Sequence, residues 1–299
     1  MNIIRKKKKK NSIKQPYRDQ TQLLALGKLL MNQQHLLPKM DFRDYGFKIF
    51  SQFDDDGLIQ YLIKNIRIDN KIFIEFGVED YEESNTRFLM MNNNWQGLVM
   101  DGSNDNIMKI RKAGYFWRYD LMAKSVFITR ENINVLLEEY GAQDIGLLSI
   151  DLDGNDAHIL EAIDMKTLNP SIIIVEYNSI FGKERAISVP YDKSFIRREK
   201  HYSGLYYGAS LRALSHMAKE KGYALIGCNS FGNNAYFVRN DLINESVMEK
   251  SVEEAFVTSH FRESRDISGK LTFLGGSRRI ECIKGLKVIN MINGEEELI

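Results

Sequence analysis

Short apolar segments alternate with segments of helical periodicity along the middle of the chain, and this alternation limits its fold more than any other feature. We expect strands at 72–76, 97–101, 126–129, 146–152 and 171–177. The last two are nearly continuous runs of Ile, Leu and Val, which is typical of parallel strands buried on both faces. The alternation predicts an α/β doubly wound sheet, mostly parallel, with helices on both faces.

The elements around these strands divide the chain into parts. Apolar residues at helical spacing predict helices at 84–93, 106–113, 132–140, 157–163 and 210–221. The strands 223–228 and 235–239 are joined by the turn residues NSFGNN, so an antiparallel hairpin should end the sheet. The main domain is then 70–241, preceded by a helical extension at 20–69 with helices at 20–34 and within 51–64. Residues 242–299 should add a helix at 247–256 and a small strand-rich tail.

Composition excludes several classes of protein. The chain has 299 residues, 43% hydrophobic and 27% charged, which suits one large globular domain with small additions. Its 41 basic residues are balanced by 40 acidic ones, so a general nucleic-acid binder is not expected. Cys228 and Cys282 have neither metal spacing nor a disulfide framework. Without a secretory signal or an apolar stretch long enough for a bilayer, a cytoplasmic protein is expected.

The first residues carry a concentrated positive charge. Arg5, Lys6 to Lys10, Lys14 and Arg18 precede the first acidic residue. We expect residues 1–19 to be a solvated, disordered tail, and a weak attraction to an anionic membrane surface is the alternative. The leucine-rich helix at 20–34 could pack on the core or mediate formation of a homodimer.

The ends of the first two strands have the layout of a cofactor pocket. Glu75 and Gly77 end the first strand, and Asp101 ends the second at the spacing of an acid that accepts hydrogen bonds from a ribose. The loop after Gly77, VEDYEE, is acidic and would repel the phosphates of a dinucleotide. It would not repel the sulfonium and ammonium groups of S-adenosylmethionine. The alternative is an ordinary βαβ unit with an acidic surface loop.

The ends of the fourth and fifth strands are rich in oxygen ligands. The first has the sequence IDLDGND, with Asp151, Asp153 and Asp156, and the second has VEYNS, with Glu176 and Asn178. Because these strands should be neighbours, Asp151, Asp153, Glu176 and Asn178 could hold magnesium or manganese. Alternatively, the first segment is a turn and helix cap and Glu176 forms a salt bridge.

The chain then leaves the strand-helix rhythm at 179–209, on the same edge as the strand ends. An insertion of this length is usually functional or mobile, and we expect it to form a lid over the acceptor. Its histidine, His201, could accept a proton during catalysis, as could the carboxylates of Asp151, Asp153 and Glu176. A lone histidine is otherwise a surface or packing residue.

These motifs together carry a resemblance to a known family. The segments SQFDDDG, FIEFGVEDYEESNT, GLVMDGS, LLSIDLDGND, IIIVEYNS and GNNAYFVR resemble those of the FkbM-type S-adenosylmethionine-dependent methyltransferases, over roughly 44–241. The resemblance implies a class I methyltransferase Rossmann-like fold and methyl transfer to oxygen, often on a sugar. It places Glu75 and Gly77 near the methionine part of the cofactor, Asp101 on its ribose, Thr129 and Asn132 near its adenine, and Asp151 beside the transferred methyl group. The chain departs from the family in having Gly77 without the second and third glycines of the usual motif.

The expected function is therefore an S-adenosylmethionine-dependent O-methyltransferase acting on a hydroxyl of a small-molecule or glycan acceptor, assisted by a divalent metal. A metal-dependent glycosyltransferase is an alternative, because Asp151, Leu152 and Asp153 form a D-x-D triplet. The acidic first loop argues against the diphosphate of its nucleotide sugar. A further alternative is a binding subunit that has lost catalysis.

Overall fold

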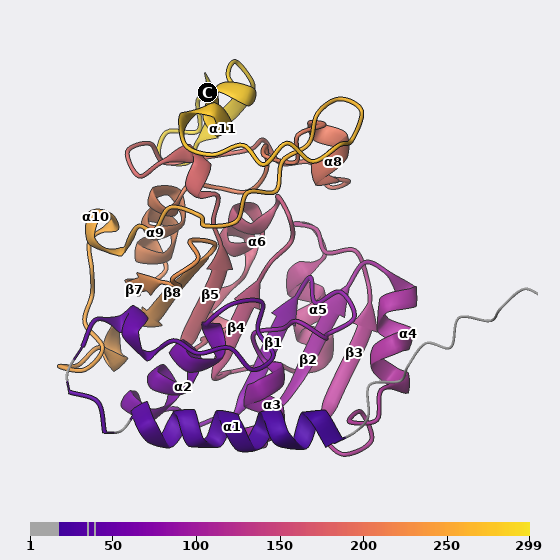
Figure 1. The fold of residues 1–299 in the computed structure, drawn as a ribbon, viewed down its shortest axis with the longest axis vertical. Coiled ribbons are helices and arrows are strands. Elements are labelled where there is room, and N and C mark those ends of the chain that lie inside the picture. The colour runs from indigo at the N-terminus through magenta and orange to yellow at the C-terminus, as the bar shows by residue number, and fades with distance from the viewer. Residues whose placement is uncertain (1–17, 35, 39) are drawn as a thin grey trace, which may run out of the picture.

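The computed structural model describes residues 18–34, 36–38 and 40–299, and its centre is a seven-stranded sheet in the order β3-β2-β1-β4-β5-β8-β7 (Figure 1). The strands are β1 (Ile72–Phe76), β2 (Gln96–Asp101), β3 (Leu121–Ser125), β4 (Leu147–Ile150), β5 (Ile172–Glu176), β7 (Tyr223–Cys228) and β8 (Asn234–Arg239). The first five pair in parallel, and β8 runs antiparallel to both of its neighbours. The predicted doubly wound α/β sheet with a terminal antiparallel hairpin is confirmed.

Helices cover both faces of the sheet because successive strand residues point to opposite sides. Phe73 belongs to one apolar core, with residues of α2 (Asp55–Asn65), α3 (Arg87–Asn93) and α4 (Asn104–Lys112). Its neighbour Ile74 belongs to the other core, which is closed by α5 (Ile133–Tyr140), α6 (Asp156–Ala162), α7 (Met165–Leu168) and α9 (Leu211–Glu220). Because the five parallel strands run in the same direction, they all end at one edge of this helix-covered sheet.

Two predicted elements are wrong. The strand expected at 126–129 is irregular, and the third strand is β3 at Leu121–Ser125. As an edge strand β3 has one open face, so Met122 is 53% exposed and the apolar run expected of a buried strand is missing. Of the helix expected at 247–256, α10 covers only Val252–Ala255. Ser251 and Glu254 form a capping box that starts the helix there, and the chain before it makes a tight turn.

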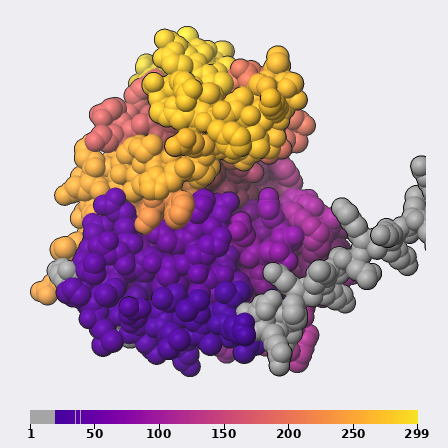
Figure 2. Space-filling view, in the orientation of Figure 1, coloured from indigo at the N-terminus to yellow at the C-terminus, as the bar shows by residue number. Residues whose placement is uncertain are grey.

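The insertion at 179–209 and the C-terminal residues form a small cap with its own core. It contains η2 (Ser179–Phe181), β6 (Ile187–Ser188), α8 (Arg197–Lys200), α11 (Ser277–Cys282), β9 (Lys287–Asn290) and β10 (Glu296–Leu298). A three-stranded sheet, β10-β9-β6, joins the insertion to the tail, and Leu205, Ile283 and Val288 pack in the core beneath it. The cap lies over the end of the molecule where the parallel strands finish, opposite α1 (Figures 1 and 2).

The N-terminal extension consists of α1 (Arg18–Gln34), η1 (Phe42–Tyr45) and α2, and it is fastened to β8 and to the turn before it. The buried carboxylate of Asp55, at the start of α2, accepts hydrogen bonds from Asn229, from Asn234 and from the hydroxyl of Tyr236 on β8. The next residue, Asp56, accepts hydrogen bonds from the backbone N–H groups of 49–51. The acidic motif that begins this helix is thus a structural clamp.

Charged residues at the very start of the chain, Arg5, Lys6 to Lys10 and Lys14, lie outside the described residues. Within the described part, no helix is both long enough and apolar enough to cross a membrane.

The clamp gives a prediction for stability. Replacing Asp55 by Ala leaves three buried donors without an acceptor, so the free energy of unfolding should fall by about 3 to 5 kcal/mol. Asp54→Ala is the matched control, because within the described residues that half-buried carboxylate accepts only the backbone N–H of Ser230. Its loss should cost about 1 kcal/mol. Urea denaturation measures both, and equal losses in the two variants would contradict the clamp.

Candidate functional site

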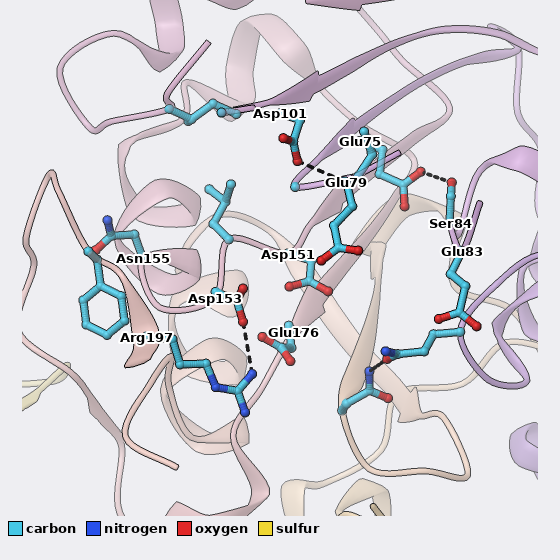
Figure 3. Close-up of a pocket in the computed structure, with 18 of the residues that line it drawn as sticks. Glu75, Glu79, Glu83, Ser84, Asp101, Asp151, Asp153, Asn155, Glu176 and Arg197 are labelled. Atoms are coloured by element: carbon cyan, nitrogen blue, oxygen red, sulfur yellow. Dashed lines mark hydrogen bonds and ion pairs between the residues drawn. The ribbon is translucent and has the colours of Figure 1, made fainter. Parts of the chain in front are cut away.

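A pocket of about 940 Å³ lies at the carboxyl ends of β1, β2, β4 and β5, under the cap. Its walls come from distant parts of the chain: Phe53 of the extension, Asp101 and Asp151 after their strands, Arg197 of the insertion and Phe261 of the tail. The volume is at the upper end of what small-molecule sites enclose, and this edge is where doubly wound sheets bind ligands. Figure 3 shows that several carboxylates point into the same space.

Gly77 fixes the floor of the pocket. Its φ of +72° is in the left-handed region, and its N–H donates to the backbone oxygen of Met100 at 2.9 Å. A Cβ atom at this position would lie 1.6 Å from the backbone oxygen of Asp151. The glycine therefore lets the end of β1 lie against the backbone that follows β4.

Glu75 lies near the end of β1, and its side chain holds the far end of the acidic loop that follows the strand. Its carboxylate accepts hydrogen bonds from the hydroxyls of Ser84 and Thr86, at 2.6 and 2.5 Å, and from the backbone N–H of Asn85 at 2.9 Å. Burial raises the pKa of Glu75 in spite of these hydrogen bonds. Because Ser84 to Thr86 are held in this way, α3 begins at Arg87 and not at the expected 84. Glu75 lines the pocket, as expected, and its carboxylate is already hydrogen-bonded to Ser84, Asn85 and Thr86.

Asp101 lines the pocket and orders the loops around it. One carboxylate oxygen accepts the backbone N–H of Glu79 at 2.9 Å, and the other accepts that of Ser103 at 2.8 Å (Figure 3). The side-chain amide of Asn106 also donates to Asp101, at 3.4 Å. A carboxylate has about four acceptor positions, so capacity for a ligand hydroxyl remains. The half-buried position is consistent with the ribose contact that the sequence predicts.

The residues expected near an adenine are shifted along the chain. Thr129 and Asn132 do not line the pocket: the Asn132 side chain accepts the N–H of Thr129 and donates to the backbone oxygen of Phe127, closing a turn. Instead Val126, Phe127 and Ile128 form an apolar wall. The segment 126–129, which was expected to be the third strand, thus supplies this wall of the pocket.

Three carboxylates form a cluster in which Asp156 and Glu176 are buried and Asp151 is half-buried. Asp151, Asp156 and Glu176 each offer an oxygen within 4.8 Å of the others. Burial, and then the charges of Asp153 and Asp151 respectively, raise the pKa of Asp151 and that of Glu176 well above their usual range. Glu176 Oε2 is buried without a hydrogen-bond partner. Such a cluster has to be neutralised by protons or by a cation.

Asp156, one of the oxygen-bearing side chains expected at this edge, belongs to the cluster and also fastens the turn after β4. It accepts the N–H of Leu152 at 2.7 Å and that of Gly154 at 3.0 Å, while burial raises its pKa to about 6. Asp153 was expected in the cluster, but its φ of +54° turns it towards the insertion, where it forms an ion pair with Arg197 at 3.0 Å (Figure 3). The alternation rule fails because β4 ends at Ile150.

Two further expected site residues are not brought to the pocket. The amide of Asn178 donates to the backbone oxygens of Leu205 and Tyr207 and accepts the N–H of Ile180, so it holds the insertion in place. His201 lies 2.7 Å from the hydroxyl of Ser203 and does not line the pocket. As a metal ligand and as a catalytic histidine, respectively, these two residues are misplaced by the sequence analysis.

An aromatic platform at the pocket was not predicted from the sequence. Phe53 stacks on Phe231 with ring centroids 4.1 Å apart and on Phe261 at 5.8 Å. Phe53 and Phe261 line the pocket. No local pattern could have joined residues from the extension, the β7–β8 turn and the tail, although Phe53 lies within the acidic motif before α2.

Comparisons with known proteins give the following. No family model and no curated protein sequence matches the chain. Among solved structures, an O-methyltransferase from Bacillus cereus in complex with SAH is 14% identical and aligns over 76% of this chain and 94% of that one, with a TM-score of 0.43. A putative O-methyltransferase from Klebsiella pneumoniae is 14% identical over 73% and 90%, with a TM-score of 0.40. An S-adenosylmethionine-dependent methyltransferase from Clostridium acetobutylicum is 10% identical over 73% and 96%, with a TM-score of 0.38.

The contact between β1 and β4 can be tested with a pair of glycines. Gly77 and Gly141 have φ values of +72° and +69°, but nothing lies within 4 Å of a Cβ at Gly141. Ala at Gly141 should therefore cost only the backbone term of about 1 to 2 kcal/mol. Ala at Gly77 should cost at least about twice that, because the loop after β4 has to move. Denaturation curves would contradict this reading if the two variants were equally stable.

Proposed function

We propose that the protein is an S-adenosylmethionine-dependent methyltransferase. The observation that carries this proposal is the charge of the pocket. Among the described residues, eight carboxylates line it, against three arginines. All three arginines are already in ion pairs: Arg197 with Asp153, and Arg198 and Arg265 with Glu263. Such a site favours a cationic ligand without phosphate.

The same arginine pairing weighs against the nucleotide-sugar alternative. A diphosphate needs unpaired cations or a row of backbone N–H groups, and the loop after β1 offers carboxylates instead. Asp153, one half of the D-x-D triplet, is held by Arg197 and not by the acid cluster.

The residues present fit the parts of S-adenosylmethionine. Asp101 would accept hydrogen bonds from the ribose hydroxyls, and the wall of Val126, Phe127 and Ile128 would cover the adenine. The carboxylates at the floor would balance the positive charge of the methionine part. When bound, S-adenosylmethionine supplies a methyl group activated by its sulfonium.

We further propose that the acceptor is a hydroxyl of a sugar or glycan-related molecule. Asp151 and Glu176 face one another at the pocket floor (Figure 3), and a carboxylate with a raised pKa is a competent acceptor of the hydroxyl proton. The platform of Phe53 and Phe261 offers flat apolar surface for a sugar ring. The insertion, through Arg197, forms one side of the same pocket.

The last part of the proposal is a divalent cation at Asp151, Asp156 and Glu176. Oxygen ligands of this kind suit magnesium or manganese, and the unpartnered Glu176 Oε2 fits a cation ligand. A cation held there would lower the pKa of an acceptor hydroxyl and fix its oxygen beside the cluster. The carboxylates that hold the cation would then act as its ligands, and Asp151 and Glu176 would be the proton acceptors only in a metal-free site.

The cofactor assignment gives a prediction for affinity. Asp101→Ala removes a charge-assisted hydrogen bond, so the Kd for S-adenosylmethionine should rise on the order of tenfold to a hundredfold. The control is Asp105→Ala in the first turn of α4, an exposed carboxylate outside the pocket. Calorimetry on both variants decides the matter, and an unchanged Kd in a folded Asp101→Ala protein would remove the ribose assignment.

The metal assignment gives a prediction that does not depend on activity alone. Magnesium or manganese should raise the Tm of the wild type after treatment with EDTA, because ligation relieves the repulsion among buried carboxylates. Glu176→Gln should abolish this rise, whereas Glu83→Gln, which changes a carboxylate of the same pocket outside the cluster, should keep it. Methyl transfer should disappear with EDTA and return with the metal. Full activity in protein shown to be metal-free by elemental analysis would leave Asp151 and Glu176 as proton acceptors only.

A further inference from the structure

A second cavity, of about 560 Å³, lies in the cap. It is bounded by η2, by the extended segment 258–262 and by the start of α11. Its lining contains His260, Arg262 and Arg279, together with hydroxyl groups of serine and threonine, and no carboxylate. The lining of this cavity is therefore positively charged, whereas that of the first pocket is negatively charged.

Arg279 is the unusual residue of this cavity. Arg279 is only 6% exposed, and its side-chain Nε is buried without a hydrogen-bond partner among the described residues. Within the described residues it forms no ion pair and no side-chain hydrogen bond. Burial lowers its pKa. A buried guanidinium is ordinarily paired, because removing its charge from water is costly unless an anion compensates.

The segment that separates the two cavities explains why no carboxylate among the described residues pairs with Arg279. In the extended segment 258–265, Phe261 and Glu263 line the first pocket, whereas His260 and Arg262 line the second. Glu263, the acid of this segment, forms its ion pairs with Arg198 and Arg265 on the other side. The compensating anion has to come from outside the chain.

We propose that this cavity is a binding site for a phosphorylated small molecule, whose phosphate pairs with Arg279 and Arg262. A guanidinium matches phosphate oxygens in a bidentate geometry, and a desolvated one does so more strongly than an exposed one. The cavity is larger than one phosphate needs, so the rest of the molecule would occupy the space beside Ile180 and Leu274. The proposal is independent of methyl transfer in the first pocket.

Inorganic pyrophosphate is the probe for this site. Titrated into the full chain, it should bind and raise the Tm of the wild type. Arg279→Met should fold, be at least as stable as the wild type without pyrophosphate, and bind it at least about tenfold more weakly. Arg278→Met is the matched control, because this neighbouring arginine of α11 is exposed and lies outside the cavity. It should behave like the wild type.

A second variant keeps the test decisive if Arg279→Met does not fold. Arg262→Met changes an exposed side chain at the rim and should weaken pyrophosphate binding without loss of structure. The proposal is overturned if the wild type does not bind pyrophosphate, if Arg262→Met and a folded Arg279→Met bind it as the wild type does, or if acetate saturates the site equally well.

Discussion

The close approach of β1 to β4 at Gly77 is the constraint on which the site depends. With no side chain at this position, the backbone of Asp151 lies directly beneath the turn that follows β1. The two strands pair in parallel and leave the sheet together, so Glu75, Asp101 and Asp151 reach one pocket. A larger residue would displace the loop that carries Asp151, Asp153 and Asp156, and with it the whole acidic floor.

The buried acids fall into two kinds according to their hydrogen bonds. Asp55 and Glu75 each accept several hydrogen bonds from side chains or backbone, so their burial is compensated within the chain. Glu176 has an oxygen with no partner, and it faces Asp151. Hydrogen-bonded acids hold structure, whereas an uncompensated pair in a pocket indicates chemistry. By the same reasoning, Arg279 is a buried cation whose charge is not compensated by any described residue.

Much of the sheet could be predicted from sequence because a strand such as β5 is buried on both faces and is apolar from Ile172 to Val175. The edge strand β3 could not, because half of its residues face solvent. The positions of Asp101 and Asp151 at the pocket were predictable because Asp101 ends β2 and Asp151 directly follows β4. Asn178 was not, because alternation ends with the strand and the side chain then follows the loop.

Long-range contacts were beyond any local pattern. The aromatic platform joins Phe53, Phe231 and Phe261, and only the folded chain brings these rings together. The roles of Asp55 and Arg279 are equally invisible, since a buried charge is recognised by what surrounds it. The acidic motif at the start of α2 resembled an ordinary helix start. Its function as a clamp is recognisable only from the contacts of Asp55 with β8.

The clamp also has a consequence for the order in which the molecule forms. Asp55 and Asn234 are 179 residues apart in the chain. During synthesis the extension therefore emerges long before its partners on β8 exist, and until then the Asp55 carboxylate stays in water. Contacts of such separation form late because a long loop has to close first. The extension should accordingly dock as one of the last steps of folding, sealing a sheet whose central strands are already assembled.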